Sequence, residues 1–297
     1  WGAEVDEEFG NFDYLMGADL DFSNPRVVKE CKDWGRWYLD LTKVDGFRLD
    51  AVKHIDANFY KEWIQTLRDE SKKELFAVGE YWSTDVNRLH RYITETEGKI
   101  SLFDVPLHYN LFNASNDPNY NMSQILEHTL VKENPCMAVT FVDNHDTQPG
   151  QALQSFVQGW FKSIAYSIIL LRNDGYPCVF YGDYYGIEHD HIEPVNDLKT
   201  LMLIRKEKSY GLQHDYFDHN NFIGWTQEGD DEHLSSGLAV VISNAGDGYK
   251  RMYVGNQNVG ETYIDCLGNC EEEVTIDEDG CGNFGVKSRS VSVWIKK

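Results

Sequence analysis

The stretch 44–50, VDGFRLD, is a short apolar strand pattern that ends on a carboxylate. Two further stretches repeat this arrangement, 75–80 (LFAVGE) and 138–146 (AVTFVDNHD). Short, mostly apolar runs of this kind are typical of strands that are buried on both faces, as in a parallel sheet. Because each run ends in Asp or Glu, we expect these carboxylates at the carboxyl ends of strands, where the loops of a β/α barrel form its active face.

Apolar runs alternate with helical patterns from about residue 44 to about residue 208, which is the order that builds a parallel sheet with crossover helices. The predicted strands are 46–51, 75–79, 100–105, 138–143 and 177–181. Helical spacing of apolar residues follows two of them, in the stripes Phe59, Trp63 and Leu67, and Trp160, Ile164, Ser167, Ile168 and Leu171. A further helix is predicted over 26–41, with Asn24 as its cap and Pro25 in its first turn.

The pattern changes after residue 212, where short strands are separated by Gly, Asn and Asp. These strands are predicted at 222–226, 238–243, 251–254 and 290–295. The sequence therefore predicts three regions: an irregular acidic entry over 1–25, a β/α part over 26–212, and an antiparallel all-β domain over 213–297.

The charge balance excludes two classes of partner. The 49 acidic and 27 basic residues give a formal charge of -22, which repels nucleic acid and anionic lipid. No apolar run approaches the roughly 20 residues that a membrane span requires. We therefore expect a globular protein with no nucleic-acid or membrane partner.

The six cysteines divide into two groups. Those in apolar stretches are predicted to be small buried hydrophobes: Cys31, Cys136 and Cys178. The other three lie in one short segment, where a disulfide, a metal site or coincidence all remain open: Cys266, Cys270 and Cys281. Free thiols favour a reducing, cytoplasmic compartment, but secretion stays open because the chain starts with Trp and its true N-terminus is expected to be missing.

Arg48 and Asp50 are two residues apart, so a strand places both side chains on one face and the cation can keep Asp50 ionised. Glu80 has no cation at the matching position, and Tyr81 and Trp82 are expected to raise its pKa by desolvation. A single Asp at a strand end is more often a helix cap, and a single Arg-x-Asp more often a structural salt bridge. Three such carboxylates in order favour a functional site instead.

The segments DGFRLDAVKH (45–54), GEYW (79–82) and FVDNHDTQPGQ (141–151) resemble, in this order, the strand-end motifs of the alpha-amylase family, in particular its bacterial liquefying and cytoplasmic types. The resemblance runs through the whole chain. It implies the C-terminal part of a (β/α)8 TIM barrel, strands four to eight, followed by an antiparallel Greek-key β-sandwich. It also implies retaining, endo-acting hydrolysis of α-1,4-glucosidic bonds in starch, glycogen and maltodextrins.

Residue roles follow from the same resemblance. Asp50 is expected to be the nucleophile, Glu80 the general acid and base, and Asp146 the third carboxylate, which holds sugar hydroxyls. His145 resembles the family histidine that hydrogen-bonds the sugar at the cleavage point. The remaining substrate-side residues implied are Arg48, Lys53, His54, Trp82 and Gln151.

The resemblance also implies one structural calcium ion at the edge of the inserted B domain. Its expected ligands are the carboxylates of Asp13, Asp19 and Asp21 and the carbonyl of His54, although an acidic solvated loop is the alternative. Gly2 and Ser23 stand where relatives with a linked metal cluster have aspartates. Asn220, Asn221 and Asn244 likewise replace the charged ligands of a site between the barrel and the C-terminal domain.

The first three barrel strands and most of the B domain are expected to be absent from the chain. An open five-stranded sheet exposes two edges, so we expect something to cover them. The cover is either the missing segment, which is a separate chain or is left out of the sequence, or a second copy of this chain. Two other functions remain open: a relative that trims maltodextrins or transfers glycosyl units, and, from another class, an inactive fragment that binds glucan.

Overall fold

The computed structural model describes residues 20–297, which belong to two compact units. The first unit comprises the described residues up to Pro106 together with His128–Val139, and the second comprises Leu107–Glu127 and Thr140–Lys297. No helix among the described residues is both long and apolar enough to cross a membrane.

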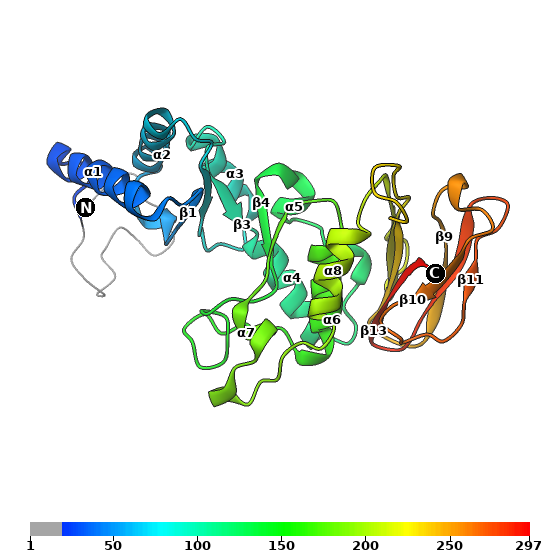
Figure 1. Ribbon diagram of the computed structural model, residues 1–297. Coiled ribbons are helices and arrows are strands. Elements are labelled where there is room, and N and C mark those ends of the chain that lie inside the picture. The colour runs from blue at the N-terminus through cyan, green and yellow to red at the C-terminus, as the bar shows by residue number, and fades with distance from the viewer. Residues whose placement is uncertain (1–19) are drawn as a thin grey trace. The chain divides into compact units, whose positions relative to one another are not determined.

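The first unit is built from strands that pair in parallel, with helices between them (Figure 1). Its elements are α1 (Pro25–Thr42), β1 (Gly46–Leu49), η1 (Val52–His54), α2 (Ala57–Ser71), β2 (Phe76–Gly79), α3 (Val86–Glu95), β3 (Ser101–Phe103), α5 (Leu130–Glu133), η3 (Pro135–Met137) and the start of β4 (Ala138–Phe141). Leu49 is in register with Gly79, and Leu102 with Ala138. The predicted strands are present but shorter. β3 ends early because Val105 already begins helix α4, and β1 and β2 end before the carboxylate that follows each of them.

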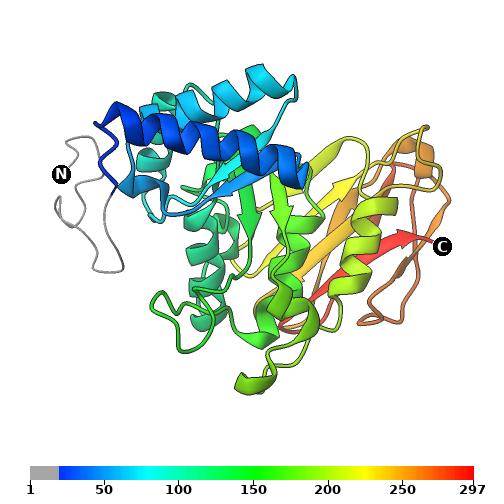
Figure 2. The same ribbon diagram turned by 60° about the vertical axis from the view of Figure 1, so that its left-hand side comes forward.

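Helix α1 begins and ends where its local chemistry requires. The Asn24 side chain accepts a hydrogen bond from the Arg26 N–H, and Lys43 ends the helix in the left-handed conformation at φ 58°. The predicted cap and first-turn proline are therefore confirmed. Helices α1 and α2 lie side by side (Figure 2), because Gly35 leaves room for the Trp63 ring: a Cβ at Gly35 would be 2.8 Å from it.

The second unit contains the rest of the β/α part and the C-terminal β domain. Its first part contains α4 (Val105–Asn116), η2 (Met122–Gln124), the end of β4, η4 (Gly159–Phe161), α6 (Lys162–Leu170), β5 (Tyr176–Cys178), α7 (Tyr181–Tyr185), η5 (Glu188–Asp190) and α8 (Leu198–Glu207). The strand order β1-β2-β3-β4-β5 confirms a partial barrel sheet. Nearly all of α6 is buried, so the predicted one-sided stripe is too narrow: the helix packs against both α8 and strand β13 of the C-terminal domain.

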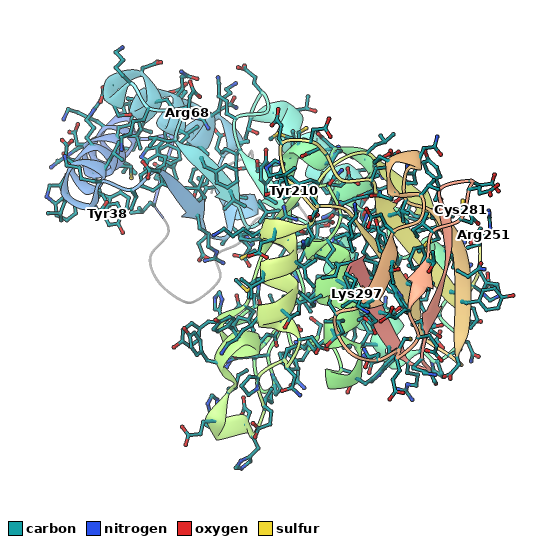
Figure 3. The ribbon with its side chains drawn as sticks, turned by 45° about the vertical axis from the view of Figure 1, so that its right-hand side comes forward. Tyr38, Arg68, Tyr210, Arg251, Cys281 and Lys297 are labelled. Carbon is teal, nitrogen blue, oxygen red and sulfur yellow. The ribbon has the colours of Figure 1, made fainter. Side chains whose placement is uncertain are left out.

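The C-terminal domain is an antiparallel sandwich. Its elements are β6 (Gln213–Tyr216), β7 (Phe222–Gln227), β8 (Leu238–Ser243), β9 (Gly248–Tyr253), η6 (Asn256–Asn258), β10 (Thr262–Asp265), β11 (Val274–Thr275), β12 (Cys281–Val286) and β13 (Ser290–Lys296). Six strands form one sheet in the order β11-β10-β13-β8-β7-β6, and β12 pairs with β9 in a second. Tyr263, Phe284 and Trp294 fill the space between them. Figure 3 shows Arg251 and Cys281 on the β9–β12 pair.

Two of the cysteine predictions are wrong. Cys136 and Cys178 are exposed, and Cys31 is only partly buried. Cys136 lies in the 3-10 helix η3, none of whose residues is buried, and Cys178 ends β5, an edge strand that also has no buried residue. No disulfide joins any two of the six cysteines, all of which lie among the described residues, and of the C-terminal three only Cys270 is buried.

The three asparagines expected to replace metal ligands lie within the second unit. Asn244 Nδ2 donates to the Tyr120 carbonyl at 2.9 Å, and Asn221 Nδ2 donates to Asn244 Oδ1 at 2.9 Å. The Asn220 carbonyl accepts from the Met122 N–H at 2.7 Å. Amide hydrogen bonds thus join the segment after α4 to the C-terminal domain at these positions.

Candidate active site

Asp50 and Glu80 form a carboxylate pair within the first unit. Asp50 directly follows β1 and Glu80 directly follows β2, and the parallel register of these strands brings both to one edge of the sheet. Arg48 links them: its Nη1 is 2.8 Å from Asp50 Oδ1 and its Nη2 is 3.3 Å from Glu80 Oε2. One guanidinium therefore holds two carboxylates that come from adjacent strands.

The sequence has no cation at the matching position before Glu80, and the structure supplies one from the neighbouring strand instead. The sequence places Arg48 beside Asp50, but only the pairing of β1 with β2, with Arg48 in register with Val78, carries the guanidinium across to Glu80. The expected contact of Arg48 with Asp50 is present.

Glu80 is fixed by the backbone and largely shielded from water. Its N–H donates to the Leu49 carbonyl at 2.8 Å, and its Oε2 accepts from the Ala51 N–H at 3.2 Å. Ala51 adopts a left-handed conformation at φ 47°, which turns that N–H toward the carboxylate. Burial raises the pKa of Glu80, the Ala51 N–H and the Arg48 charge lower it, and the nearby Asp50 charge and hydrogen bond raise it again, with a net increase.

The two carboxylates of this pair are exposed to very different degrees. The Asp50 side chain is 73% exposed, whereas that of Glu80 is 10% exposed. One is therefore accessible to an incoming ligand, and the other holds a proton more tightly than an ordinary glutamate.

The other substrate-side candidates of the first unit follow Asp50 or Glu80 within a few residues along the chain. Lys53 Nζ donates to the Trp82 carbonyl at 3.1 Å, which ties the turn after β1 to the turn after β2. His54 is exposed at the end of η1, and Trp82 is partly buried. Tyr81 is buried, with its ring centroid 5.3 Å from that of Tyr92. Trp82 is thus more accessible than Tyr81.

Asp146 and His145 lie in the second unit, on a tight turn after β4. His145 Nε2 is 3.2 Å from Asp146 Oδ2, and both side chains are partly exposed. The Asn144 Oδ1 atom accepts from the N–H groups of Asp146 and Thr147 at 2.9 and 3.0 Å, which folds the turn. Gln151, further along this loop, is exposed.

A buried ionic cluster beneath this turn was not predicted from the sequence. Lys162 Nζ, at the start of α6, hydrogen-bonds Asp143 Oδ2 and also Asp183 Oδ1, the latter at 2.7 Å. The Tyr166 hydroxyl donates to Asp183 Oδ2 at 2.6 Å. We call Asp143, Lys162, Tyr166 and Asp183 the buried cluster. Its sequence signal was weak, because a lysine in a helix is normally assigned to solvent.

Burial dominates the electrostatics of this cluster. Desolvation raises the pKa of Asp143 to about 7, and the Lys162 ammonium only partly opposes that rise. His108 lies close by, stacked on Phe141 at 5.1 Å, and desolvation lowers its pKa to about 4. It hydrogen-bonds the Val142 carbonyl and Ser155 Oγ at 2.6 and 2.8 Å, so both ring nitrogens are occupied.

The predicted calcium ligands are only partly within the described residues. Asp13 and Asp19 lie outside them, so their roles stay predictions. Asp21 Oδ1 accepts from the Ser23 N–H at 3.0 Å and from its hydroxyl at 2.5 Å. Across residues 20–297, no group of three or more His, Cys, Asp and Glu side chains is arranged to hold a metal. The expected donors are all oxygen, which suits calcium.

Known proteins resemble the chain over its whole length. The family model "Alpha amylase, catalytic domain" matches residues 1–239, and "Alpha-amylase C-terminal" matches 238–295. An alpha-amylase from Geobacillus stearothermophilus is 52% identical over all of the chain and 54% of its own length. The cytoplasmic alpha-amylase of Escherichia coli (strain K12) is 46% identical over 99% of the chain and 62% of its own length.

A glucan 1,4-alpha-maltohexaosidase from Bacillus sp. (strain 707) is 48% identical over all of the chain and 58% of its own length. Among solved structures, an Anoxybacillus alpha-amylase aligns with a TM-score of 0.73 at 19% identity over 94% of the chain and 64% of that protein, which supports the fold. The chain thus spans somewhat more than half the length of the curated relatives it matches.

Proposed function

The chain belongs to the alpha-amylase family of glycoside hydrolases, and from that premise we propose that it carries the catalytic carboxylates for endo-acting, retaining cleavage of α-1,4-glucosidic bonds. The proposed substrates are starch, glycogen and maltodextrins. The observation that carries this proposal is the Asp50–Glu80 pair on Arg48, since retention needs two carboxyl groups close together.

In the proposed first step, an Asp50 carboxylate oxygen attacks the anomeric carbon while Glu80 gives its proton to the leaving glycosidic oxygen. The raised pKa of Glu80 supports its role as the acid, and the exposed, Arg48-bound Asp50 is suited to attack. In the second step Glu80 takes a proton from water, whose oxygen attacks the anomeric carbon and releases Asp50.

The remaining roles are carried over from the matching motifs. Asp146 is proposed to hold sugar hydroxyls as the third carboxylate, with His145 donating a hydrogen bond to the sugar. Arg48, Lys53, His54, Trp82 and Gln151 are the other proposed substrate-side residues. The predicted limits of the three regions, 1–25, 26–212 and 213–297, remain part of this proposal.

The stereochemistry of the product tests the mechanism. Proton NMR of the first product released from maltoheptaose should show the α-anomer, which then equilibrates by mutarotation. An initial β-anomer would mean inversion and would rule out Asp50 as a nucleophile. Product lengths from soluble starch and maltoheptaose distinguish endo-cleavage from maltodextrin trimming and glycosyl transfer. Binding of glucan with no new reducing ends would instead identify an inactive, glucan-binding chain.

We further propose one structural calcium ion, held by Asp13 and Asp19 with Asp21 and the His54 carbonyl. Oxygen donors of this kind suit calcium, whose binding would stabilise the folded chain. Removing it with a chelator should lower the unfolding temperature by several degrees, and added calcium should restore it. The variant Asp19→Asn should show a smaller response to the chelator, and an equal response would refute this site.

The sheet edges support the last part of the proposal, a covering segment. Strands β1 and β5 end the five-stranded sheet, and helix α1, which precedes β1 in the chain, carries the exposed side chains of Trp34 and Trp37. Relatives extend well beyond the matched region, so a segment corresponding to their first barrel strands is the proposed cover, with self-association as the alternative. Light scattering that gives a monodisperse, uncovered monomer of this chain would contradict both.

A further inference from the structure

The turn after β4 has two faces with opposite environments. On its outer face, His145 and Asp146 are accessible, with side chains 62% and 37% exposed. On its inner face, Asp143 and Thr147 are buried. The proposed third carboxylate is therefore displayed by a turn whose other side is anchored in the core.

Side-chain hydrogen bonds connect the two faces. Thr147 Oγ1 accepts from the Asn144 N–H at 3.0 Å and donates to Asp143 Oδ1 at 2.8 Å. Asn144 Oδ1 in turn accepts from the Asp146 N–H at 2.9 Å. The backbone of Asp146 is thus fixed through Asn144 and Thr147 to the Asp143 carboxyl.

Asp143 is itself held from the far side. Lys162 Nζ hydrogen-bonds its Oδ2 atom, and the Val157 N–H lies 3.2 Å from the same oxygen. Lys162 also bonds Asp183, and its ammonium lies 3.7 Å from the centroid of the Phe156 ring. The ammonium is fixed on several sides, with its side chain only 3% exposed.

A buried group of two carboxylates and one ammonium costs desolvation free energy that a close-packed apolar cluster would not. Stability alone therefore explains this cluster poorly. What it does provide is a fixed direction for Asp143, and through Asp143 for the turn.

We propose that Lys162 is a positioning residue: acting through Asp143, Thr147 and Asn144, it holds the turn that presents Asp146 to the substrate. This inference rests on the proposed function for the role of Asp146. The anchoring of the turn by Lys162 can be measured without any catalytic activity.

Hydrogen exchange followed by NMR on the whole chain measures the anchoring directly. The amides of Asn144, Asp146 and Thr147 report the turn, and the amides of β8 report global opening of the second unit. In Lys162→Met, the exchange rates of the turn amides should rise by a factor at least ten times larger than the factor by which the exchange rates of the β8 amides rise. Exchange that accelerates by the same factor in the turn and in β8 would show that Lys162 stabilises the whole unit and does not hold the turn in particular, which would overturn the proposal.

Arg172 provides a matched control. It is equally buried in the same unit and bonds Asp215 at 2.6 Å and Asp174 at 3.1 Å, yet it bonds no residue of the turn. Arg172→Met should accelerate exchange in β8 without adding any extra acceleration in the turn. If Lys162→Met does not fold, Asp143→Asn carries the same comparison, because it keeps the side-chain shape and replaces the carboxyl that Lys162 and Thr147 bind.

Activity provides the second readout. In a protein that carries this chain and cleaves starch, Lys162→Met should lower kcat at least tenfold with a smaller change in KM, since binding groups elsewhere are retained. A parent protein without activity would refute the proposed function while the exchange experiment still decides the anchoring. Local acceleration together with unchanged kcat would contradict a role for that turn in positioning Asp146.

Discussion

Two clusters in this chain have the same charge composition, two carboxylates around one cation, and opposite surroundings. In the first unit Arg48 joins Asp50, which is exposed, and Glu80, which is largely buried, at the ends of adjacent strands. In the second unit Lys162 joins Asp143 and Asp183 where no side chain of the three is more than 3% exposed.

Exposure, more than charge, distinguishes these two clusters. Asp50 is open to a ligand while its neighbour Glu80 is buried, so the pair splits into one accessible carboxylate and one with a raised pKa. In the buried cluster no carboxylate is accessible, and each oxygen is held by a specific donor. The first cluster offers a carboxylate that a ligand can reach, whereas the second offers none.

Asp50→Asn should have the largest effect of the substitutions in either cluster. It removes the proposed nucleophile, so reducing-sugar release from soluble starch should fall by about a thousandfold or more. The unfolding temperature should hardly change, because the side chain is largely exposed. Asp45→Asn is the control: Asp45 lies just before the same strand, its side chain is 92% exposed, and its ion pair with Lys73 is a surface contact. Equal activity of Asp50→Asn and parent would show that the nucleophile lies elsewhere.

Arg48→Met tests whether the shared cation matters to both carboxylates. We expect kcat/KM to fall by about a hundredfold, as for other losses of fixed charge in an active site. The Arg48 charge lowers the pKa of Glu80, so its removal should raise that pKa further and move the alkaline limb of the pH–rate profile to higher pH. Arg48→Lys keeps the charge and should shift the limb less. A limb that stays in place in Arg48→Met would show that Glu80 is not the titrating acid.

The same two clusters show what the sequence could and could not predict. The places of Asp50 and Glu80 directly after strands, of Asp146 in the turn after β4, and the Arg48–Asp50 contact follow from local periodicity, which needs no knowledge of distant residues. The Arg48–Glu80 contact depends on the register of β1 against β2, and the Lys162–Asp143 contact on how α6 packs against the turn after β4. Neither arrangement is encoded in spacing along the chain, so both were missed.

Asp143→Asn tests the buried side of the comparison through stability. At pH 5 folded Asp143 is protonated, so the variant replaces one neutral hydrogen-bonding group by a less well fitted one and should cost about 2 kcal/mol in the free energy of unfolding. Folded Asp143 keeps its proton up to about pH 7, whereas its unfolded pKa is near 3.8, so its contribution to stability falls as pH rises through that window.

Asn does not titrate, so the difference in free energy of unfolding between parent and variant, measured by urea unfolding, should shrink from about pH 4 to pH 7. Asp218→Asn is the control, since the Asp218 side chain is 69% exposed and pairs with Lys250 at the surface. A difference that grows with pH over this range would mean that Asp143 is not held protonated by burial.

Two buried tyrosines give the finest comparison between the units. The Tyr166 hydroxyl donates to Asp183 at 2.6 Å, whereas the Tyr92 hydroxyl in the first unit is buried with no hydrogen-bond partner among the described residues. Tyr166→Phe leaves a carboxylate short of a donor and should destabilise the chain by about 1.5 kcal/mol. Tyr92→Phe removes an unsatisfied group and should be neutral or slightly stabilising, within about 0.5 kcal/mol. Equal losses in urea unfolding would show that packing of the ring, and not the bond to Asp183, sets the cost.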